Sequence, residues 1–318
     1  MSGAESLPGL APLGFGCAQL FRLHSARERQ AVLAAAYDAG IRHFDVAPLY
    51  GLGQAETELG LFLRGRRDTV TVTTKFGLDP ATGMSAVRVV QGMARRLVNA
   101  VPPLKRYLQN RRRPLARSQS FEPKAAQASL ERSLRRLNTE WIDYFLLHEP
   151  TADLVDRDQP IEFLQQQKKR GLIRAFGVAG PVEPLAVVIA RHPTLAGVVQ
   201  HPGPPLGERN VTLPQPSHGQ SFIYGSVGPR LQAIKTMLIA NPAAGDAWRP
   251  QFAPDHDRNL ASLLLLDQRM SSPSSTILFG STKPAHVAAL AVTISSQDRA
   301  NVMRLREWAR TATKMGVD

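Results

Sequence analysis

The feature that most constrains the fold is a regular alternation of helix and strand signals through the first half of the chain. Ser25 and Glu28 have the spacing of a capping box, and Gly40 is placed to end the helix that begins after Ser25. Strands are expected first at the opening segment with Gly14 and Gly16, and then at residues 41–45, 70–75, 142–147, 172–178 and 196–200, which is the sixth. Further helices are expected at residues 54–64, 123–137 and 159–170. Strands that alternate with helices in this way predict successive αβ units.

The second half of the chain carries weaker signals of the same kind. Prolines interrupt the stretch after the sixth expected strand, at positions Pro202, Pro204, Pro205, Pro214 and Pro216. Two more strands are expected at residues 222–225 and 274–280, each followed by a helix, and a last helix at about residues 297–313. At 318 residues the chain has a size at which an α/β barrel forms one core.

Four polar residues fall at or just beyond the ends of expected strands, namely Asp45, Tyr50, Lys75 and His148. Polar residues at the C-terminal ends of successive strands converge on one rim, which is where barrel enzymes carry their chemistry. A lysine beside a tyrosine favours the phenolate over the ordinary tyrosine pKa of about 10. A carboxylate compensates the buried ammonium, and a histidine can hydrogen-bond a substrate oxygen. The set predicts proton transfer at a carbonyl or an alcohol.

Each of the four residues also has an ordinary structural interpretation when taken alone. Asp45 could cap a turn, and Tyr50 could be a packing residue. Lys75 could be a charge at a strand end, and His148 a hydrogen-bonded core histidine. Their joint placement at strand ends favours the catalytic interpretation.

The order and spacing of these residues, together with nearby glycines, resemble those of the aldo-keto reductase family. The matching positions are Gly14, Gly16, Asp45, Tyr50, Gly51, Glu56, Gly60, Lys75 and His148. The resemblance covers nearly the whole chain and is closest from Gly14 to Gly177, and the segment DYFLLHEP is most similar to the aldose-dehydrogenase branch. It implies a (β/α)8 TIM barrel, with residues 1–318 forming a single domain. It also implies binding of NADPH, or less often NADH, and hydride transfer to or from the carbonyl carbon of an aldehyde, ketone or sugar.

The expected roles of the four residues follow from their charge. Tyr50 would donate a proton to the carbonyl oxygen as hydride reaches the carbonyl carbon, and would remove it in the alcohol-oxidising direction. Lys75 would make that exchange easier while Asp45 holds Lys75. His148 would orient the substrate oxygen.

The expected cofactor contacts depart in part from the family pattern. Where the family often has Ser-Asn after the fifth strand to hold the nicotinamide carboxamide, this chain has Ala179 and Gly180. Gln200 matches the remaining carboxamide contact of the family. Tyr224 stands where an aromatic ring stacks on nicotinamide, and a core aromatic is an equally good interpretation of it.

A segment after the eighth expected strand resembles the family's clamp for the adenosine 2′-phosphate. It comprises Gly280, Ser281, Thr282, Lys283 and His286. Gly280 and His286 stand where the strictest family form has a lysine and an arginine, so Lys283 and the following helix N-terminus would have to attract the phosphate. We therefore expect NADP, with NAD as the alternative cofactor and an ordinary helix cap as the structural alternative. No G-x-G-x-x-G motif follows a strand, so a Rossmann site is not indicated.

The departures from the cofactor clamp leave a second hypothesis open. A barrel that keeps the four rim residues could act as a binding or regulatory protein, or could catalyse redox-neutral chemistry. Titration of the protein with NADPH and NADH distinguishes the two hypotheses.

The net charge of +13 is unevenly placed. Residues 79–120 contain nine Lys or Arg residues and one acidic residue, Asp79. We expect this basic insertion to be helical and to lie beside the active-site mouth, because it follows Lys75 directly. A rim that attracts an anionic cofactor or substrate and a merely solvated face are equally open. Nucleic-acid binding is not favoured, because few aromatic residues accompany the basic ones and no nucleic-acid fold is recognisable.

The remaining sequence features concern location and metals. The single cysteine, Cys17, excludes an intrachain disulfide, and the N-terminal segment lacks the basic and long apolar regions of a signal peptide, so we expect a cytoplasmic protein. The run of four leucines at residues 263–266 is too short to cross a bilayer. Neither H-E-x-x-H nor C-x-x-C occurs, so we expect no metal site, and a small carbonyl or alcohol compound as the binding partner.

Overall fold

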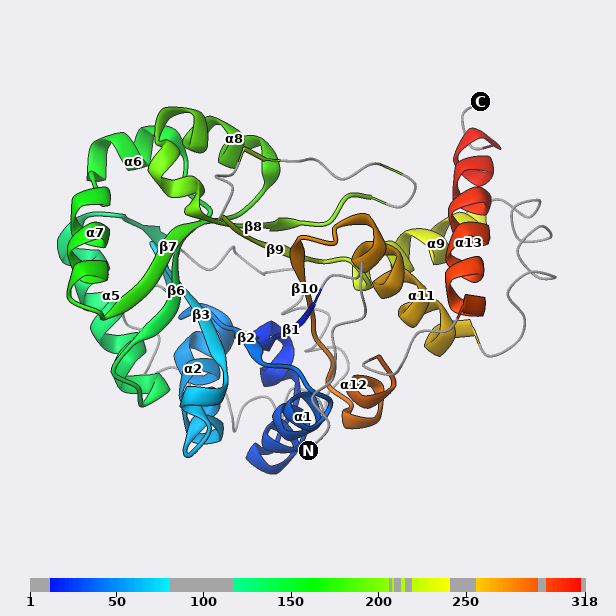
Figure 1. The fold of residues 1–318 in the computed structure, drawn as a ribbon, viewed down its shortest axis with the longest axis horizontal. Helices are drawn as coiled ribbons and strands as arrows, with labels where there is room; N and C mark the ends of the chain where they lie inside the picture. The colour runs from blue at the N-terminus through cyan, green and yellow to red at the C-terminus, as the bar shows by residue number, and fades with distance from the viewer. Residues whose placement is uncertain are drawn as a thin grey trace, which may run out of the picture.

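A closed barrel of parallel strands forms the centre of the molecule (Figure 1). The computed structural model describes residues 12–80, 117–205, 208, 213–214, 219–240, 256–290 and 296–315. The barrel strands are β1 (Leu13–Gly16), β2 (His43–Asp45), β3 (Thr71–Phe76), β6 (Ile142–His148), β7 (Ile173–Ala179), β8 (Val198–Pro202), β9 (Gln220–Tyr224) and β10 (Ser275–Phe279). They are hydrogen-bonded in the order β1-β10-β9-β8-β7-β6-β3-β2, and every pairing is parallel. The expected (β/α)8 barrel is confirmed.

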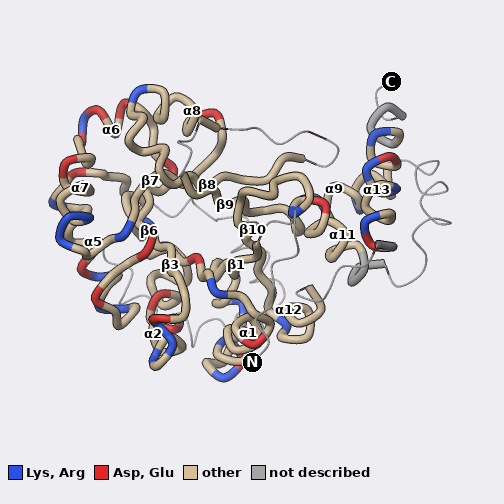
Figure 2. Tube along the Cα trace, viewed as in Figure 1, with Lys and Arg blue, Asp and Glu red and all other residues tan. Residues whose placement is uncertain are grey.

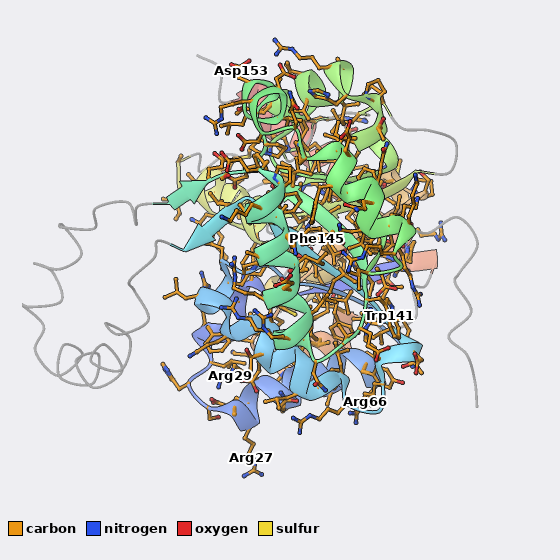
Figure 3. All side chains as sticks on the ribbon, turned by 90° about the vertical axis from the view of Figure 1, so that its left-hand side faces the viewer. Arg27, Arg29, Arg66, Trp141, Phe145 and Asp153 are labelled. Atoms are coloured by element: carbon orange, nitrogen blue, oxygen red, sulfur yellow. The ribbon has the colours of Figure 1, made fainter. Side chains whose placement is uncertain are left out.

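Helices surround the barrel. They are α1 (Ala26–Asp38), α2 (Gln54–Leu63), α5 (Pro123–Leu137), α6 (Ala152–Asp158), α7 (Ile161–Lys169), α8 (Val182–Arg191), α9 (Gly228–Ala240), α11 (His256–Ser271), α12 (Pro284–Leu290) and α13 (Ser296–Met315). Figure 1 shows α5 to α8 on one side of the barrel and α9, α11 and α13 together on the other. In Figure 2 most of the coloured Lys, Arg, Asp and Glu positions lie on the outer helices, whereas the strands are mainly tan. Figure 3 likewise shows the side chains of Arg27 and Asp153 at the outer surface, at opposite ends of that view.

The local signals at the helix ends behave as expected. Ser25 accepts a hydrogen bond from the backbone N–H of Glu28, and the Glu28 carboxylate accepts one from the backbone N–H of Ser25, so the capping box is present. Gly40 has a φ of 87°, which is the left-handed conformation expected after this helix. Helix α5 has the bounds expected from the sequence, with Pro123 in its first turn and Asn138 in a left-handed conformation at its C-cap.

Three of the described helices, α6, α8 and α11, were not expected from the sequence. Helix α6 spans only seven residues, too few to establish a helical period. Helix α11 contains the apolar run 263–266, whose consecutive leucines obscure the period because all four are buried. Its Asp267 accepts hydrogen bonds from Arg230 of α9 at 2.7 Å and Arg306 of α13 at 2.5 Å, so this carboxylate ties α9, α11 and α13 together.

The two ends of the basic insertion pair with each other as short strands. β4 (Leu78–Pro80) and β5 (Arg117–Gln119) form an antiparallel two-stranded sheet, so the expectation of a wholly helical insertion is wrong at both of its ends. Antiparallel pairing of the entering and leaving chain satisfies backbone groups where the insertion joins the barrel. The rest of the insertion, residues 81–116, lies outside the described residues.

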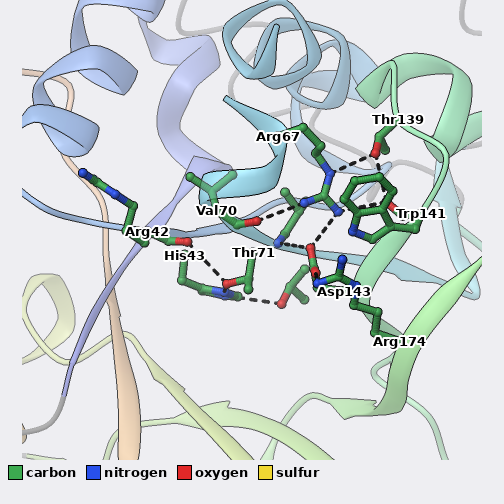
Figure 4. Close-up of polar contacts among 11 residues, drawn as sticks. Arg42, His43, Arg67, Val70, Thr71, Thr139, Trp141, Asp143 and Arg174 are labelled. Carbon is green, nitrogen blue, oxygen red and sulfur yellow. Dashed lines mark hydrogen bonds and ion pairs between the residues drawn. The ribbon is translucent and has the colours of Figure 1, made fainter. Parts of the chain in front are cut away.

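The N-terminal end of the barrel is held by a buried carboxylate, Asp143 of β6 (Figure 4). Its Oδ2 accepts hydrogen bonds from Nη2 of Arg67 at 2.7 Å and from the backbone N–H of Val72 at 2.9 Å. Its Oδ1 forms an ion pair with Arg174 at 3.1 Å. The guanidinium groups of Arg67 and Arg174 lie 4.4 Å and 5.0 Å from the ring of Trp141. This network lies at the end of a barrel that serves stability rather than chemistry.

Candidate active site

Side chains of the barrel strands alternate between the outer helices and the barrel interior, and this alternation aims the expected rim residues inward. On β6, Phe145 and Leu147 belong to the outer core, whereas Leu146 belongs to the cluster inside the barrel. His148 therefore projects into the barrel at the C-terminal end of the strand. The same alternation on β2 and β3 aims Asp45 and Lys75 inward at the same end, as shown by the hydrogen bond between them.

Asp45 and Lys75 form a buried ion pair. Nζ of Lys75 donates to Oδ1 of Asp45 at 2.7 Å and to the carbonyl oxygen of Val46 at 3.1 Å, and the two side chains are only 2% and 5% exposed. Gln200 donates from Nε2 to the same Asp45 oxygen at 3.0 Å. Burial alone would lower the pKa of Lys75, but the charge of Asp45 and the hydrogen bonds to Asp45 and Tyr50 outweigh it, so the net pKa lies above its ordinary value. Lys75 is therefore an ammonium at neutral pH.

Tyr50 reaches the same region from a short 3-10 turn, residues Tyr50–Gly53, between β2 and α2. Its ring centroid lies 5.1 Å from Nζ of Lys75, and its ring meets that of His148 edge-on, with 6.4 Å between the centroids. Gly51 adopts a φ of 55°, and a Cβ there would fall 2.5 Å from the ring of Phe21, so the turn that presents Tyr50 requires glycine. The structure thus brings the four expected rim residues together.

The net pKa of Tyr50 differs from the expectation. Lys75 lowers the pKa of Tyr50, as predicted from the sequence, but burial of the hydroxyl raises it by more. The pKa of Tyr50 consequently lies above its ordinary value, and the prediction that the phenolate is favoured is wrong for this structure. Tyr50 carries its proton at neutral pH, which suits a proton donor.

Two further residues expected at the cofactor site lie on the same rim. Gln200 is 2% exposed, and its Oε1 has no hydrogen-bond partner among the residues that the structure describes. Tyr224 is partly buried at the end of β9, and burial raises its pKa to about 12. The Gln200 amide therefore donates from Nε2 to Asp45 of the ion pair, while its Oε1 remains available to accept a hydrogen bond.

The residues expected at the phosphate clamp form the turn that leads into α12. The backbone N–H of Lys283 donates to Oγ of Ser281 at 3.1 Å, and the N–H groups of His286 and Val287 donate to the carbonyl oxygen of Lys283. Gly280 precedes this turn, and a Cβ there would lie 2.8 Å from the carbonyl oxygen of Gly16. The Ser281 contact spans two residues and forms a turn ahead of α12, whose N-cap position is Lys283. The expected phosphate contacts of Gly280, Ser281, Thr282, Lys283 and His286 stay predictions.

Several rim residues were missed by the sequence analysis. Gln119 of β5 donates from Nε2 to the backbone oxygens of Glu149 at 2.8 Å and His148 at 3.4 Å, and only the fold brings the end of the insertion to β6. Glu149 has a φ of 54°, a strained conformation that no sequence motif predicted. Ser226, at the turn before α9, is buried, and its Oγ has no partner among the described side chains and backbone. The sequence YGSVG carried a signal for Ser226, since glycines on both sides permit a tight turn before a helix.

The described ranges also bear on the expectations about metals and membranes. No group of three or more His, Cys, Asp or Glu side chains within them is arranged to hold a metal ion, and the expected absence of a metal stays a prediction. None of the helices described is both long and apolar enough to cross a membrane.

Comparisons with known proteins place this geometry in a family. The model of the aldo/keto reductase family matches residues 12–193. D-threo-aldose 1-dehydrogenase from Pseudomonas sp is 35% identical over 189 residues, which are 56% of this chain and 53% of that protein. Pyridoxal 4-dehydrogenase from Microbacterium luteolum is 43% identical over 69 residues, 22% of this chain and 19% of that protein. The chain thus matches about half the length of the first of these curated relatives, and less of the second.

Solved structures agree over a larger share of the fold. The holo form of an aldo-keto reductase from Bacillus halodurans superposes with a TM-score of 0.64 at 18% identity, covering 95% of this chain and 94% of that one. An aldo/keto reductase from Klebsiella pneumoniae in complex with NADP and acetate gives a TM-score of 0.60 at 22% identity, covering 92% and 90%. At these identities the likeness concerns the fold. Since the family model spans more than half of the residues, the chain belongs to the aldo/keto reductase family.

Proposed function

We propose that this chain is a nicotinamide-dependent oxidoreductase that interconverts a carbonyl and an alcohol, with Tyr50 as the proton donor and acceptor. The observation that carries the proposal is the buried ion pair of Lys75 and Asp45 placed under the Tyr50 ring, with His148 beside it. A buried ammonium next to a phenol stabilises the charge that the phenol acquires when it gives up its proton.

One feature of this chain's own rim supports binding of a nicotinamide cofactor. A buried amide oxygen, Oε1 of Gln200, has no partner in the described part of the chain, and a buried acceptor without a donor costs about 1–3 kcal/mol. A carboxamide N–H would satisfy it. The buried Ser226 hydroxyl, at the N-terminus of α9, offers a further contact to the anionic part of such a molecule.

The reaction follows from the protonation states. A bound nicotinamide supplies or accepts the hydride. Tyr50, which holds its proton at neutral pH, donates it to the carbonyl oxygen, and the charge of Lys75 stabilises the phenolate left behind. Asp45, which accepts a hydrogen bond from Gln200, holds Lys75 in place, and His148 orients the substrate oxygen. In the reverse direction the phenolate takes the proton from the alcohol.

We further propose NADP as the preferred cofactor and a sugar-like carbonyl compound as the substrate class. Lys283, exposed at the start of α12, is a cation that could face a 2′-phosphate. The relative from Klebsiella pneumoniae was solved with NADP, and the Pseudomonas relative is a D-threo-aldose 1-dehydrogenase. Fluorescence titration with NADPH and NADH tests the cofactor. Binding of neither would favour a barrel with a binding, regulatory or redox-neutral role.

Replacement of Tyr50 by Phe tests the catalytic assignment. The ring and its packing are kept while the proton donor is lost, so turnover should fall by about 10²–10⁴-fold while cofactor affinity is retained. Tyr144→Phe is the matched control, because Tyr144 lies lower on the inner face of the barrel, where its ring packs against Phe222. Turnover by Tyr50→Phe equal to that of the parent protein would refute the assignment.

A further inference from the structure

Glu149 holds an unusual position immediately after His148. Its backbone φ of 54° is one that residues with a branched or long side chain rarely adopt. Its N–H donates to the carbonyl oxygen of Ala179 at 2.6 Å, and its own carbonyl oxygen accepts from Gln119 at 2.8 Å. Two neighbouring segments therefore hold this backbone in a conformation that costs free energy, which is common where a side chain must point in a functional direction.

The direction of the Glu149 side chain can be located from its neighbours. A Cβ added to Gly180 would lie 3.1 Å from Cα of Glu149 and 3.6 Å from its Cγ, so the stem of Glu149 crosses the end of β7 where residue 180 has no side chain. The charge of Glu149 raises the pKa of Tyr224, which stands at the rim on β9. The carboxylate thus lies at the rim where β6 and β7 end, within electrostatic range of Tyr224, and it has no hydrogen-bond or ion-pair partner among the residues that the structure describes.

We propose that Glu149 selects the substrate at this rim, favouring neutral compounds that carry several hydroxyl groups and rejecting compounds that carry a carboxylate. The inference rests on the proposed oxidoreductase function. A carboxylate accepts hydrogen bonds from hydroxyl groups of the substrate more strongly than a neutral acceptor does. A second negative charge brought to the same rim is repelled, and rejection of this kind is a way to gain specificity.

Gln119 is a positioning residue in this arrangement. Its amide bridges the backbone oxygens of His148 and Glu149 and so links the end of the basic insertion to the left-handed residue. Loss of the amide would free the backbone of Glu149 and let the carboxylate turn toward solvent. Gln119→Ala should therefore weaken the same discrimination.

Three aldehydes of four carbons test the proposal: erythrose, which is neutral and hydroxylated, butanal, which is apolar, and succinic semialdehyde, which is anionic. For Glu149→Gln we expect kcat/KM to rise about tenfold for succinic semialdehyde, to fall several-fold for erythrose and to stay within about twofold for butanal. The gain for succinic semialdehyde should shrink at high salt, because added ions screen the repulsion that the parent protein exerts. Asp153→Asn is the control, since it removes the same charge from an exposed position on α6.

The outcomes separate the inference from the function on which it rests. If the ratios of kcat/KM among the three aldehydes are unchanged in Glu149→Gln, or shift equally in Asp153→Asn, the role of Glu149 is overturned. The proposed oxidoreductase function would be unaffected by either result. An equal fall in kcat/KM for all three aldehydes would also overturn the role of Glu149, because a residue that selects by charge and hydrogen bonding must leave kcat/KM for butanal unchanged. No turnover of any aldehyde by the parent protein with either cofactor would overturn the proposed function and this inference together.

Discussion

A histidine inside the barrel should make the protein sensitive to acid. His43 of β2 is 7% exposed, and its ring stacks on Phe222 with 4.4 Å between the centroids. Its Nδ1 and Nε2 lie 2.9 Å and 3.3 Å from the hydroxyl oxygens of Thr71 and Thr73. Burial, with a smaller contribution from the charge of Lys75, lowers the pKa of His43 from 6.5 to about 3. The ring is therefore neutral in the folded protein over the range in which it is protonated in the unfolded chain.

The sign and size of the effect follow from proton linkage. Below pH 6.5 the unfolded chain binds a proton at His43, whereas in the folded protein this ring stays unprotonated down to about pH 3. The free energy of unfolding therefore falls as the pH falls from 6.5 to about 3. The loss is about 2 kcal/mol at pH 5 and about 3 kcal/mol at pH 4. His43→Gln removes the titrating group and keeps an amide for the threonine hydroxyls.

Urea unfolding followed by tryptophan fluorescence at a series of pH values measures this dependence. His43→Gln should be less stable than the parent protein at pH 7.5, because the stacked ring is lost, but the difference should close by about 2 kcal/mol at pH 5. His192→Gln is the control, since it removes a histidine that pairs with Asp156 outside the barrel. Parallel curves for the parent protein and His43→Gln would refute the reasoning.

Three further substitutions test other parts of the structure. Lys75→Met should abolish measurable turnover and lower the free energy of unfolding by about 3–5 kcal/mol, because Asp45 would stay buried without its cation. The double variant with Asp45→Asn should recover part of that stability but none of the turnover. Asp143→Ala should lower the free energy of unfolding by about 3 kcal/mol and leave turnover of the folded enzyme unchanged, because this carboxylate lies at the opposite end of the barrel from the site. Gly60→Ala should lower the melting temperature, since its Cβ would fall 2.3 Å from a backbone oxygen of α5, whereas Leu61→Ala, at a position 45% exposed, should change stability by no more than about 0.5 kcal/mol.

The convergence of the rim residues was predictable because it depends only on two periodicities. Helices that alternate with strands make the strands parallel, and the two-residue period of a strand then decides which side chains point inward. Asp45 and Lys75 satisfy both conditions, and they meet as an ion pair. The bounds of α5 were predictable for a similar reason, because proline and a left-handed cap residue act locally.

What the sequence did not predict depends on burial and on contacts between distant segments. The net pKa of Tyr50 depends mainly on how deeply its hydroxyl is buried, and the residues next to Tyr50 in the sequence do not predict that depth. Gln119 meets Glu149 across 30 positions of sequence, through an antiparallel pairing at the base of the insertion. Helix α11 was missed because a run of buried leucines has no apolar face to distinguish from a polar one.

Both ends of the barrel hold a buried carboxylate paired with a cation, and they differ in the groups that surround that pair. At the N-terminal end, Oδ2 of Asp143 accepts hydrogen bonds from Arg67 and from the backbone N–H of Val72, and Oδ1 forms an ion pair with Arg174 but has no hydrogen bond among the described residues. At the C-terminal end, the pair of Asp45 and Lys75 is buried, and the Gln200 that supports it keeps an acceptor without a donor among the described residues. Arg174 is 62% exposed, whereas Lys75 is 2% exposed. An open acceptor beside a buried cation can bind a ligand, which is why we place the chemistry at that end.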